Sequence, residues 1–349
     1  RGEIENNLVN YFNKGALNGV SLLENGKIKD YPSVSEPVDL NLLPVPLRHH
    51  KSLVSYLESY FNPKFSKRPY TIMMASRGCS FNCLFCVPNS ISFARELEYR
   101  RKFGKKPKPT IASSERIIRE FRGLKEQGFR SVMVVDDQFL WGRKRTLEIC
   151  AGIRDLGLEW GCLSRADFLT DEEVVRALSE AGCVSIDIGV ESLNQEILDD
   201  IRKNLRVEVV YEAVRLLKAH GISPKLNIML GTSPKDTEDE IRATVRKLKA
   251  LGVENVMFSI ATPFKGTEFY ELSKKRGYLI DDSDEIDPFR KSMIRYPGLS
   301  EEALEKLQKY AYRSFYLRPS IVWNRLKKSG WGKGFLSDVK VAVRLLRWR

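Results

Sequence analysis

Six short apolar segments alternate with longer amphipathic segments between residues 70 and 261, and this alternation limits the possible folds most strongly. Each apolar segment suits a buried strand, and the longer segments show helical spacing with capping residues and Gly stops. The predicted strands are Tyr70–Ser76, Ser131–Asp137, Leu158–Arg165, Cys183–Val190, Pro224–Gly231 and Val253–Ala261. The predicted helical segments are Ser113–Gly128, Arg143–Gly157, Thr170–Gly182, Asn194–His220 (one or two helices) and Asp236–Gly252. This order predicts an α/β fold with a parallel sheet covered by helices.

A series of right-handed crossovers curls a parallel sheet toward a barrel, but six units fall short of the eight that close one. We therefore predict an open three-quarter (β/α)6 TIM-type barrel. A doubly wound open sheet is the alternative. In both folds, ligands bind at the carboxyl ends of the strands.

The chain has 349 residues, enough for one large domain with appendages or for two modest domains. We predict a connector over residues 1–66, the partial barrel over 67–280, and a helical C-terminal extension over 281–349. No apolar run approaches the roughly 18 residues that a membrane-spanning helix needs. We expect a cytoplasmic protein.

Three cysteines, Cys79, Cys83 and Cys86, follow the first predicted strand in the stretch "RGCSFNCLFC". A disulfide uses two cysteines, and a structural zinc site uses four ligands. An iron–sulfur cube normally takes four thiolates, so three would leave one iron open for a substrate or cofactor. The spacing C-x3-C-x2-C at the functional end of the sheet therefore favours a [4Fe–4S] cluster with an open iron.

The other cysteines are Cys150, Cys162 and Cys183, each alone in a predicted helix or strand. Free cysteine commonly fills cores, so we predict that role for them. One of them as a fourth ligand would instead give an electron-transfer cluster or a zinc site.

The net charge of +13 is unevenly placed, because residues 318–349 carry nine Lys or Arg and one acidic residue. Phe335–Arg349 reads as a basic amphipathic helix, and Trp323, Trp331 and Trp348 lie in the same tail. We predict that this tail docks on an anionic membrane surface at the inner face of the membrane. Packing on the barrel and RNA contact are the alternatives. A second basic run, Arg100–Pro109, indicates solvated surface or contact with an anion.

The cysteine loop after the first strand of a (β/α)6 barrel resembles that of the radical S-adenosylmethionine (SAM) enzymes, from about Tyr70 to Tyr270. Phe85, the aromatic residue before the third cysteine, matches their C-x3-C-x-Φ-C form. The resemblance implies that Cys79, Cys83 and Cys86 hold a [4Fe–4S] cluster whose open iron binds SAM. It also implies reductive cleavage of SAM to a 5′-deoxyadenosyl radical, with a flavodoxin or ferredoxin type of protein as reductant.

The resemblance also implies cofactor contacts at the strand ends. Asp136 and Asp137 correspond to the position that binds the methionyl amino group, and Arg165 to a cation for the carboxylate. Glu191 and Asn227 correspond to ribose contacts, and Lys203 to a basic residue near the carboxylate. The segment "GTSPKDT" (Gly231–Thr237) departs from the shorter G-L-P-G-E-T turn of the family. The sequence identifies no residue that acts on the substrate.

The segment from Gly2 to Leu47 resembles the connector of cobalamin-binding radical enzymes, with a helix, a "GK" hairpin and a Pro-rich strap. In that branch a Rossmann-like cobalamin domain precedes the connector. We therefore expect a domain of roughly a hundred or more residues upstream, which would bind most of the cobalamin. The branch, with "YLRPS" at Tyr316–Ser320, implies methylation or radical cyclisation of a lipid, isoprenoid or porphyrin-like substrate.

Two other functions are weighed against this one. A tRNA-modifying methylthiotransferase would carry extra upstream cysteines and a downstream RNA-binding barrel. Neither is seen in this sequence, so we expect no nucleic-acid partner. A non-catalytic iron–sulfur electron carrier would need a fourth cluster ligand.

Overall fold

The computed structural model describes residues 4–15, 17, 19–31, 37–46, 48, 62–87, 90–283 and 285–329. The chain divides into two compact units. The first consists of Arg1–Phe81, Val87–Asp187 and Arg215–Ile222, and the second of Asn82–Cys86, Ile188–Val214 and Ser223–Arg349. The cysteine loop passes from the first unit to the second between Phe81 and Asn82. The basic tail at 330–349 lies outside the described residues, so its membrane docking stays a prediction.

The predicted strands are confirmed and belong to a six-stranded sheet of order β10-β9-β8-β7-β6-β3 in the described part of the chain. Their bounds are β3 Tyr70–Met73, β6 Ser131–Val134, β7 Glu159–Ser164, β8 Cys183–Glu191, β9 Ser223–Leu230 and β10 Asn255–Ile260. The pairs β3–β6, β6–β7 and β9–β10 are parallel. The strand order follows the chain order, whereas a doubly wound sheet reverses direction at a switch point. The fold is therefore α/β, with the strand order of an open partial barrel.

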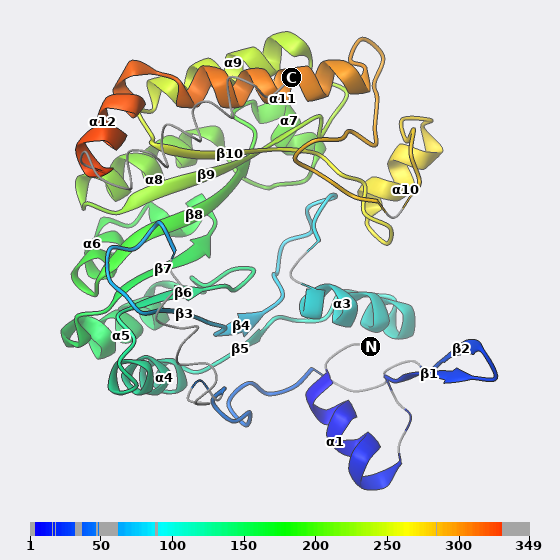
Figure 1. The fold of residues 1–349 in the computed structure, drawn as a ribbon, viewed down its shortest axis with the longest axis vertical. Coiled ribbons are helices and arrows are strands. Elements are labelled where there is room, and N and C mark those ends of the chain that lie inside the picture. The colour runs from blue at the N-terminus through cyan, green and yellow to red at the C-terminus, as the bar shows by residue number, and fades with distance from the viewer. Residues whose placement is uncertain are drawn as a thin grey trace. The chain divides into compact units, whose positions relative to one another are not determined.

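The helices between the strands are also confirmed. They are α4 Ser114–Glu126, α5 Arg143–Ile153, α6 Glu172–Glu180, α7 Gln195–Asp200, α8 Val207–Ala219 and α9 Glu238–Ala250, with 3-10 turns at Arg154–Leu156 and Ala166–Leu169. Their ends follow the sequence signals: Ser113 accepts a hydrogen bond from Arg116 N, and Thr237 accepts one from Glu240 N. In the first unit, α4, α5 and α6 lie along one side of β6 and β7 (Figure 1). No helix in the described ranges is long and apolar enough to cross a bilayer.

Several elements lie outside the alternating region. The connector contains helix α1 (Ile4–Lys14) and the hairpin β1 (Ser21–Glu24) and β2 (Lys27–Asp30). Helix α3 (Ser90–Phe103) and the antiparallel pair of β4 (Ser76–Arg77) and β5 (Thr110–Ile111) were not predicted. After the sheet come α10 Glu268–Lys275, α11 Glu301–Tyr316 and α12 Pro319–Ser329.

The segment before β3 is anchored to the sheet within the first unit. Phe65 stacks on Tyr70, with ring centroids 5.7 Å apart, and packs against Met133. Lys64 pairs with Asp187 of β8 at 2.6 Å, and Ser66 bonds to Glu159 at the start of β7. An aromatic core contact, a hydrogen bond and an ion pair therefore fix the end of the connector against four neighbouring strands, β3, β6, β7 and β8.

Candidate functional site

None of the three loop cysteines is in a disulfide, each is half-buried, and the loop backbone around them is held by defined hydrogen bonds. In the second unit, Leu84 N donates to Ile201 O at 3.1 Å, and Phe269 N donates to Leu84 O at 3.0 Å. Cys86 N donates to Cys83 O at 3.2 Å, and Phe85 between them is half-buried. This half of the loop therefore has a fixed backbone and thiols that solvent partly reaches.

The residue before Cys79 has a conformation that favours glycine. Gly78 has φ +85°, and a Cβ added there would lie 2.6 Å from Nη2 of the buried Arg95. Its N–H donates to Asp137 Oδ2 at 2.9 Å. Asp137, predicted as a cofactor contact, is half-buried and positions the first half of the cysteine loop.

Phe81, between Cys79 and Cys83, is held in place by two contacts within the first unit, in addition to the hydrogen bond between Gly78 and Asp137. The Arg165 guanidinium lies 3.6 Å from the centroid of the Phe81 ring, and Arg165 Nε donates to Asp167 Oδ1 at 3.0 Å. Lys106 Nζ donates to Phe81 O at 2.7 Å. The structure thus brings the predicted Arg165 against the cysteine loop. Sequence reasoning missed Phe81 and Lys106 as loop-positioning residues, although Lys106 lies in the basic run it identified.

Asp136 is fully buried, and protein groups occupy both of its oxygens. Ala75 N donates to Oδ1 at 2.7 Å, and Ser76 Oγ donates to Oδ2 at 2.6 Å. Burial raises its pKa from 3.8 to about 7, against the opposing effect of these hydrogen bonds and of Arg145. Asp136 therefore ties β6 to the segment before the cysteines, and its predicted contact with the methionyl amino group stays a prediction.

We expect Asp136→Asn to reduce the pH dependence of stability. The folded chain keeps this proton up to about pH 7, whereas the unfolded chain releases it near 3.8, so stability falls as the pH rises between these values. Asn can still accept from Ala75 N and can donate to Ser76 Oγ, which also donates to Gln138 O at 2.9 Å. Burial raises the pKa of Asp236 to about 7 in the same way, so a similar slope should remain in the variant.

Denaturant midpoints measured between pH 4.5 and 7.5 check this prediction. The wild type should lose more stability over this range than the variant, by about 2–3 kcal/mol. Equal slopes in the two proteins would contradict the assignment.

Two of the predicted residues pair within the second unit. Lys203 Nζ lies 2.9 Å from Glu191 Oε1, and both side chains are less than 10% exposed. Glu191 ends β8 with φ +69°. A Cβ added to Gly189 would lie 2.9 Å from Glu191 Oε1 and 3.1 Å from Lys203 Nζ, so a larger residue there would crowd the pair. Glu191 and Lys203 therefore form a buried ion pair at the carboxyl end of β8.

Asn227 lies in the second unit on β9, and its buried Oδ1 has no hydrogen-bond partner in the described residues. The hydroxyl oxygen of Thr232, just after β9, is also buried and has no hydrogen-bond partner among the described residues. Most buried polar atoms are hydrogen-bonded, so these two atoms are candidates for accepting a ligand's donors. The turn at Gly231–Thr237 is closed by Asp236, whose Oδ2 accepts from Gly231 N at 2.5 Å.

The other three cysteines are buried, as predicted for core residues. Burial raises the pKa of the thiols of Cys150, Cys162 and Cys183. They lie in the core, in α5, β7 and β8, and none is on the cysteine loop. Within the described ranges, no three His, Cys, Asp or Glu side chains converge as on one metal ion. A cube binds each thiolate through a different iron, which spreads its ligands more widely than one ion does.

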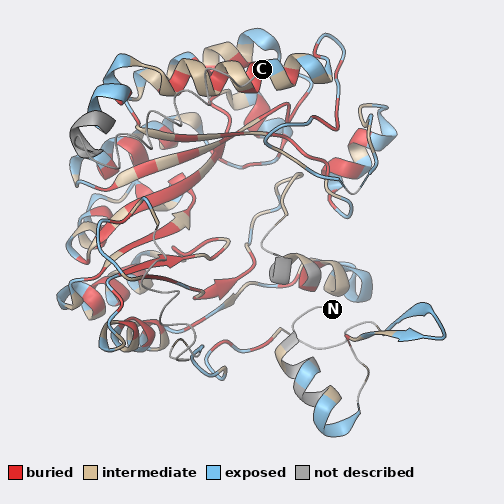
Figure 2. Cartoon of the chain, in the orientation of Figure 1, coloured by how far each residue is buried: buried red, intermediate tan, exposed pale blue. Residues whose placement is uncertain are grey.

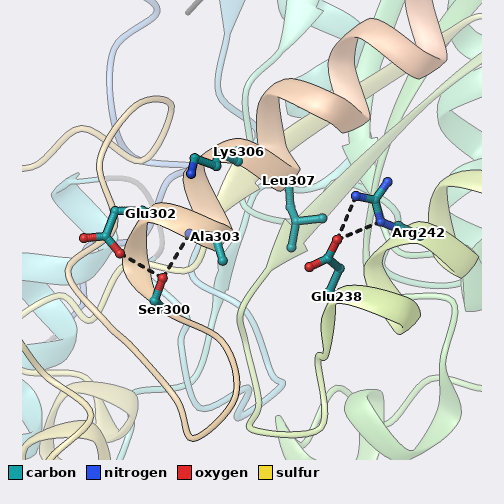
Figure 3. A pocket seen from close by; sticks show the side chains of 7 residues that line it. All are labelled: Glu238, Arg242, Ser300, Glu302, Ala303, Lys306 and Leu307. Carbon is teal, nitrogen blue, oxygen red and sulfur yellow. Dashed lines mark hydrogen bonds and ion pairs between the residues drawn. The ribbon is translucent and has the colours of Figure 1, made fainter.

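A cavity of about 520 Å³ lies between α9 and the start of α11. It is lined by Glu238, Arg242, Ser300, Glu302, Ala303, Lys306 and Leu307 (Figure 3). Arg242 is paired with Glu238 at 2.7 Å, and Ser300 bonds to Glu302 at 2.8 Å. None of the predicted site residues lines this cavity, so it is separate from the candidate site.

The fold and the loop define an α/β partial-barrel protein with three thiols after its first barrel strand. A family model described as "Radical SAM superfamily" matches residues 73–236. The chain is 31% identical over 316 residues to an uncharacterized methyltransferase of Pyrococcus horikoshii, covering 88% of this chain and 63% of that protein. It is 28% identical over 245 residues to the bacteriochlorophyllide d C-12(1)-methyltransferase of Chlorobaculum tepidum, covering 69% and 51% respectively.

A solved structure of the cobalamin-dependent S-adenosylmethionine radical enzyme OxsB, with aqua-cobalamin and S-adenosylmethionine bound, has a similar fold. The TM-score is 0.61 at 16% identity, covering 96% of this chain and 52% of that chain. Over residues 73–236 the chain therefore resembles the radical SAM superfamily. It spans 63% and 51% of the two curated relatives.

The match to the radical SAM family model implies a [4Fe–4S] cluster and SAM as cofactors. The donor set fits the cluster, because Cys79, Cys83 and Cys86 are half-buried thiols outside any disulfide and lie on one loop. The unpartnered Oδ1 of Asn227 fits a ligand with hydroxyl donors such as a ribose.

Proposed function

We propose that this chain is the core of a radical SAM enzyme that methylates an unactivated carbon, or closes a ring, in a porphyrin-like, isoprenoid or lipid substrate. The observation that carries the proposal is the loop with three half-buried thiols and a backbone held at Leu84. When bound, the cluster would supply the electron for reductive cleavage of SAM. The chain's own residues bind, orient and shield these groups.

Cys79, Cys83 and Cys86 would hold the cluster, and Gly78 and Asp137 would fix the start of the loop. Arg165 would offer its guanidinium to the SAM carboxylate while it stays stacked on Phe81. We assign Lys203 to the same carboxylate and Glu191 to the ribose hydroxyls, with each keeping the other charged in a buried place. Asn227 Oδ1 would accept from a ribose hydroxyl.

Support for the substrate class comes from the named relative in Chlorobaculum tepidum, whose substrate is a bacteriochlorophyllide. The electron-carrier alternative needs a fourth ligand, and the three other cysteines are buried in α5, β7 and β8 rather than on the cysteine loop. The family match and the methyltransferase relatives favour the enzyme.

We also propose cobalamin as the methyl carrier, bound mainly by a domain outside this chain. The support is the fold shared with OxsB and the helix-and-hairpin connector of α1, β1 and β2. Equilibrium dialysis against aqua-cobalamin tests this. We expect weak binding by residues 1–349 and tight binding by a longer protein in which a cobalamin domain precedes them. Tight binding by residues 1–349 alone, or none by either protein, would contradict the proposal.

A further inference from the structure

The end of α3 and the segment after it form a basic surface around one exposed aromatic ring. Its members are all exposed, and we name this surface the α3 patch: Arg100, Arg101, Lys102, Phe103, Lys105 and Lys108. The Phe103 ring is 39% exposed, with Lys102 Nζ 4.6 Å from its centroid. Figure 2 shows this end of α3 as exposed surface.

The charge of the α3 patch is only partly balanced by neighbouring acids. Arg100 pairs with Glu96 at 2.8 Å and Arg101 with Glu98 at 3.3 Å, yet the two Arg side chains remain 50% and 64% exposed. The α3 patch therefore has five basic residues, whereas α3 itself carries two acidic residues, Glu96 and Glu98. Protein–protein interfaces commonly have an apolar centre and a polar rim. A positively charged rim favours a partner with an acidic surface.

Two residues that neighbour the α3 patch in the chain, Lys106 and Arg95, bond to the cysteine loop or to the residue just before it, within the first unit. Lys106 donates to Phe81 O at 2.7 Å, and Arg95 Nη2 donates to Arg77 O at 3.2 Å. Phe81 lies two residues from both Cys79 and Cys83. A partner on the α3 patch would therefore lie beside the loop that we assign to the cluster.

We propose that the α3 patch docks the electron donor, a protein with an acidic surface that carries a flavin or an iron–sulfur centre. The inference rests on the proposed function, which requires one electron per SAM cleaved. Electron transfer between proteins weakens steeply with distance, so a donor should dock where the loop is near. The acidic donor matches the sign of the patch, and its apolar contacts can bury Phe103.

The test compares two electron sources in one assay of 5′-deoxyadenosine release. The charge-reversed variant Arg101→Glu/Lys105→Glu changes two exposed residues that we assign no role in the loop or in cofactor binding. With a reduced acidic flavodoxin, we expect its rate to fall about tenfold or more at low salt. With dithionite, which needs no docking, we expect the wild-type rate. The matched control Arg206→Glu/Arg290→Glu changes two residues whose side chains are each 79% exposed, and it should behave as wild type with both sources.

Rising salt should slow the flavodoxin-driven rate of the wild type toward that of the variant. A variant that keeps the full flavodoxin-driven rate, or a control that loses as much, would overturn the docking site alone. The docking site would also be overturned if the variant lost binding to RNA or to anionic vesicles while its flavodoxin-driven rate stayed unchanged. A wild type that carries the cluster but releases no 5′-deoxyadenosine with dithionite would instead overturn the proposed function.

Discussion

Replacing Cys83 with Ala is expected to reduce 5′-deoxyadenosine release to background and to remove most of the bound iron. In the proposed site Cys83 supplies one of three thiolates, and a cube held by two protein ligands would be lost or unable to bind SAM productively. The fold should survive, because Cys83 is a half-buried loop residue rather than part of the core. Iron and sulfide analysis after anaerobic reconstitution, with circular dichroism for the fold, checks this. The wild type should hold about four irons and four sulfides per chain.

Cys150→Ala provides the matched control for that variant. Cys150 is a buried thiol in α5, and burial raises its pKa to about 12. The control loses a cysteine without losing a proposed ligand, so its iron content should equal that of the wild type. Equal iron loss in both variants would show that the loop thiol has no special role.

Replacing Lys203 with Met is expected to lower the free energy of unfolding by about 3–5 kcal/mol, because it leaves the Glu191 carboxylate buried without its charge partner. The side chains of the pair are only 7% and 9% exposed, so water cannot compensate. The double variant Glu191→Gln/Lys203→Met removes both charges, and we expect it to recover most of the lost stability. Denaturant midpoints of Lys203→Met, of Glu191→Gln and of the double variant measure the coupling between the two residues. A loss under about 1 kcal/mol in Lys203→Met, or losses that simply add in the double variant, would rule out a coupled buried pair.

The strands and most of the helices could be predicted because their signals are local. Ser113 and Thr237 cap their helices as the sequence indicates, and the apolar runs mark the buried strands. Helix α3 was missed because Ser90–Phe103 has little helical amphipathicity and ends in the basic cluster of Arg100, Arg101 and Lys102. Its basic charge drew attention instead to a surface role.

The sequence names the candidate residues, but the contacts that these residues make could not be predicted from it. Asp136 and Asp137 are neighbours in sequence, yet one is buried against Ala75 and Ser76 while the other bonds to Gly78. The sequence shows the same residue type at both positions, so it cannot separate these roles, which depend on the direction of each side chain at the end of β6. The contacts of Phe81 with Lys106 and Arg165 join residues 25 and more positions apart, so only the fold reveals them. Lys203 was assigned beside the SAM carboxylate, and its pairing with Glu191 was not foreseen.

The measurement that tests the central claim most directly is 5′-deoxyadenosine release by the reconstituted chain with SAM and dithionite under anaerobic conditions. The account predicts steady release by the wild type and by Cys150→Ala, and none above background by Cys83→Ala. Sustained release by Cys83→Ala, or no release by a wild type that carries four irons and four sulfides, would contradict it.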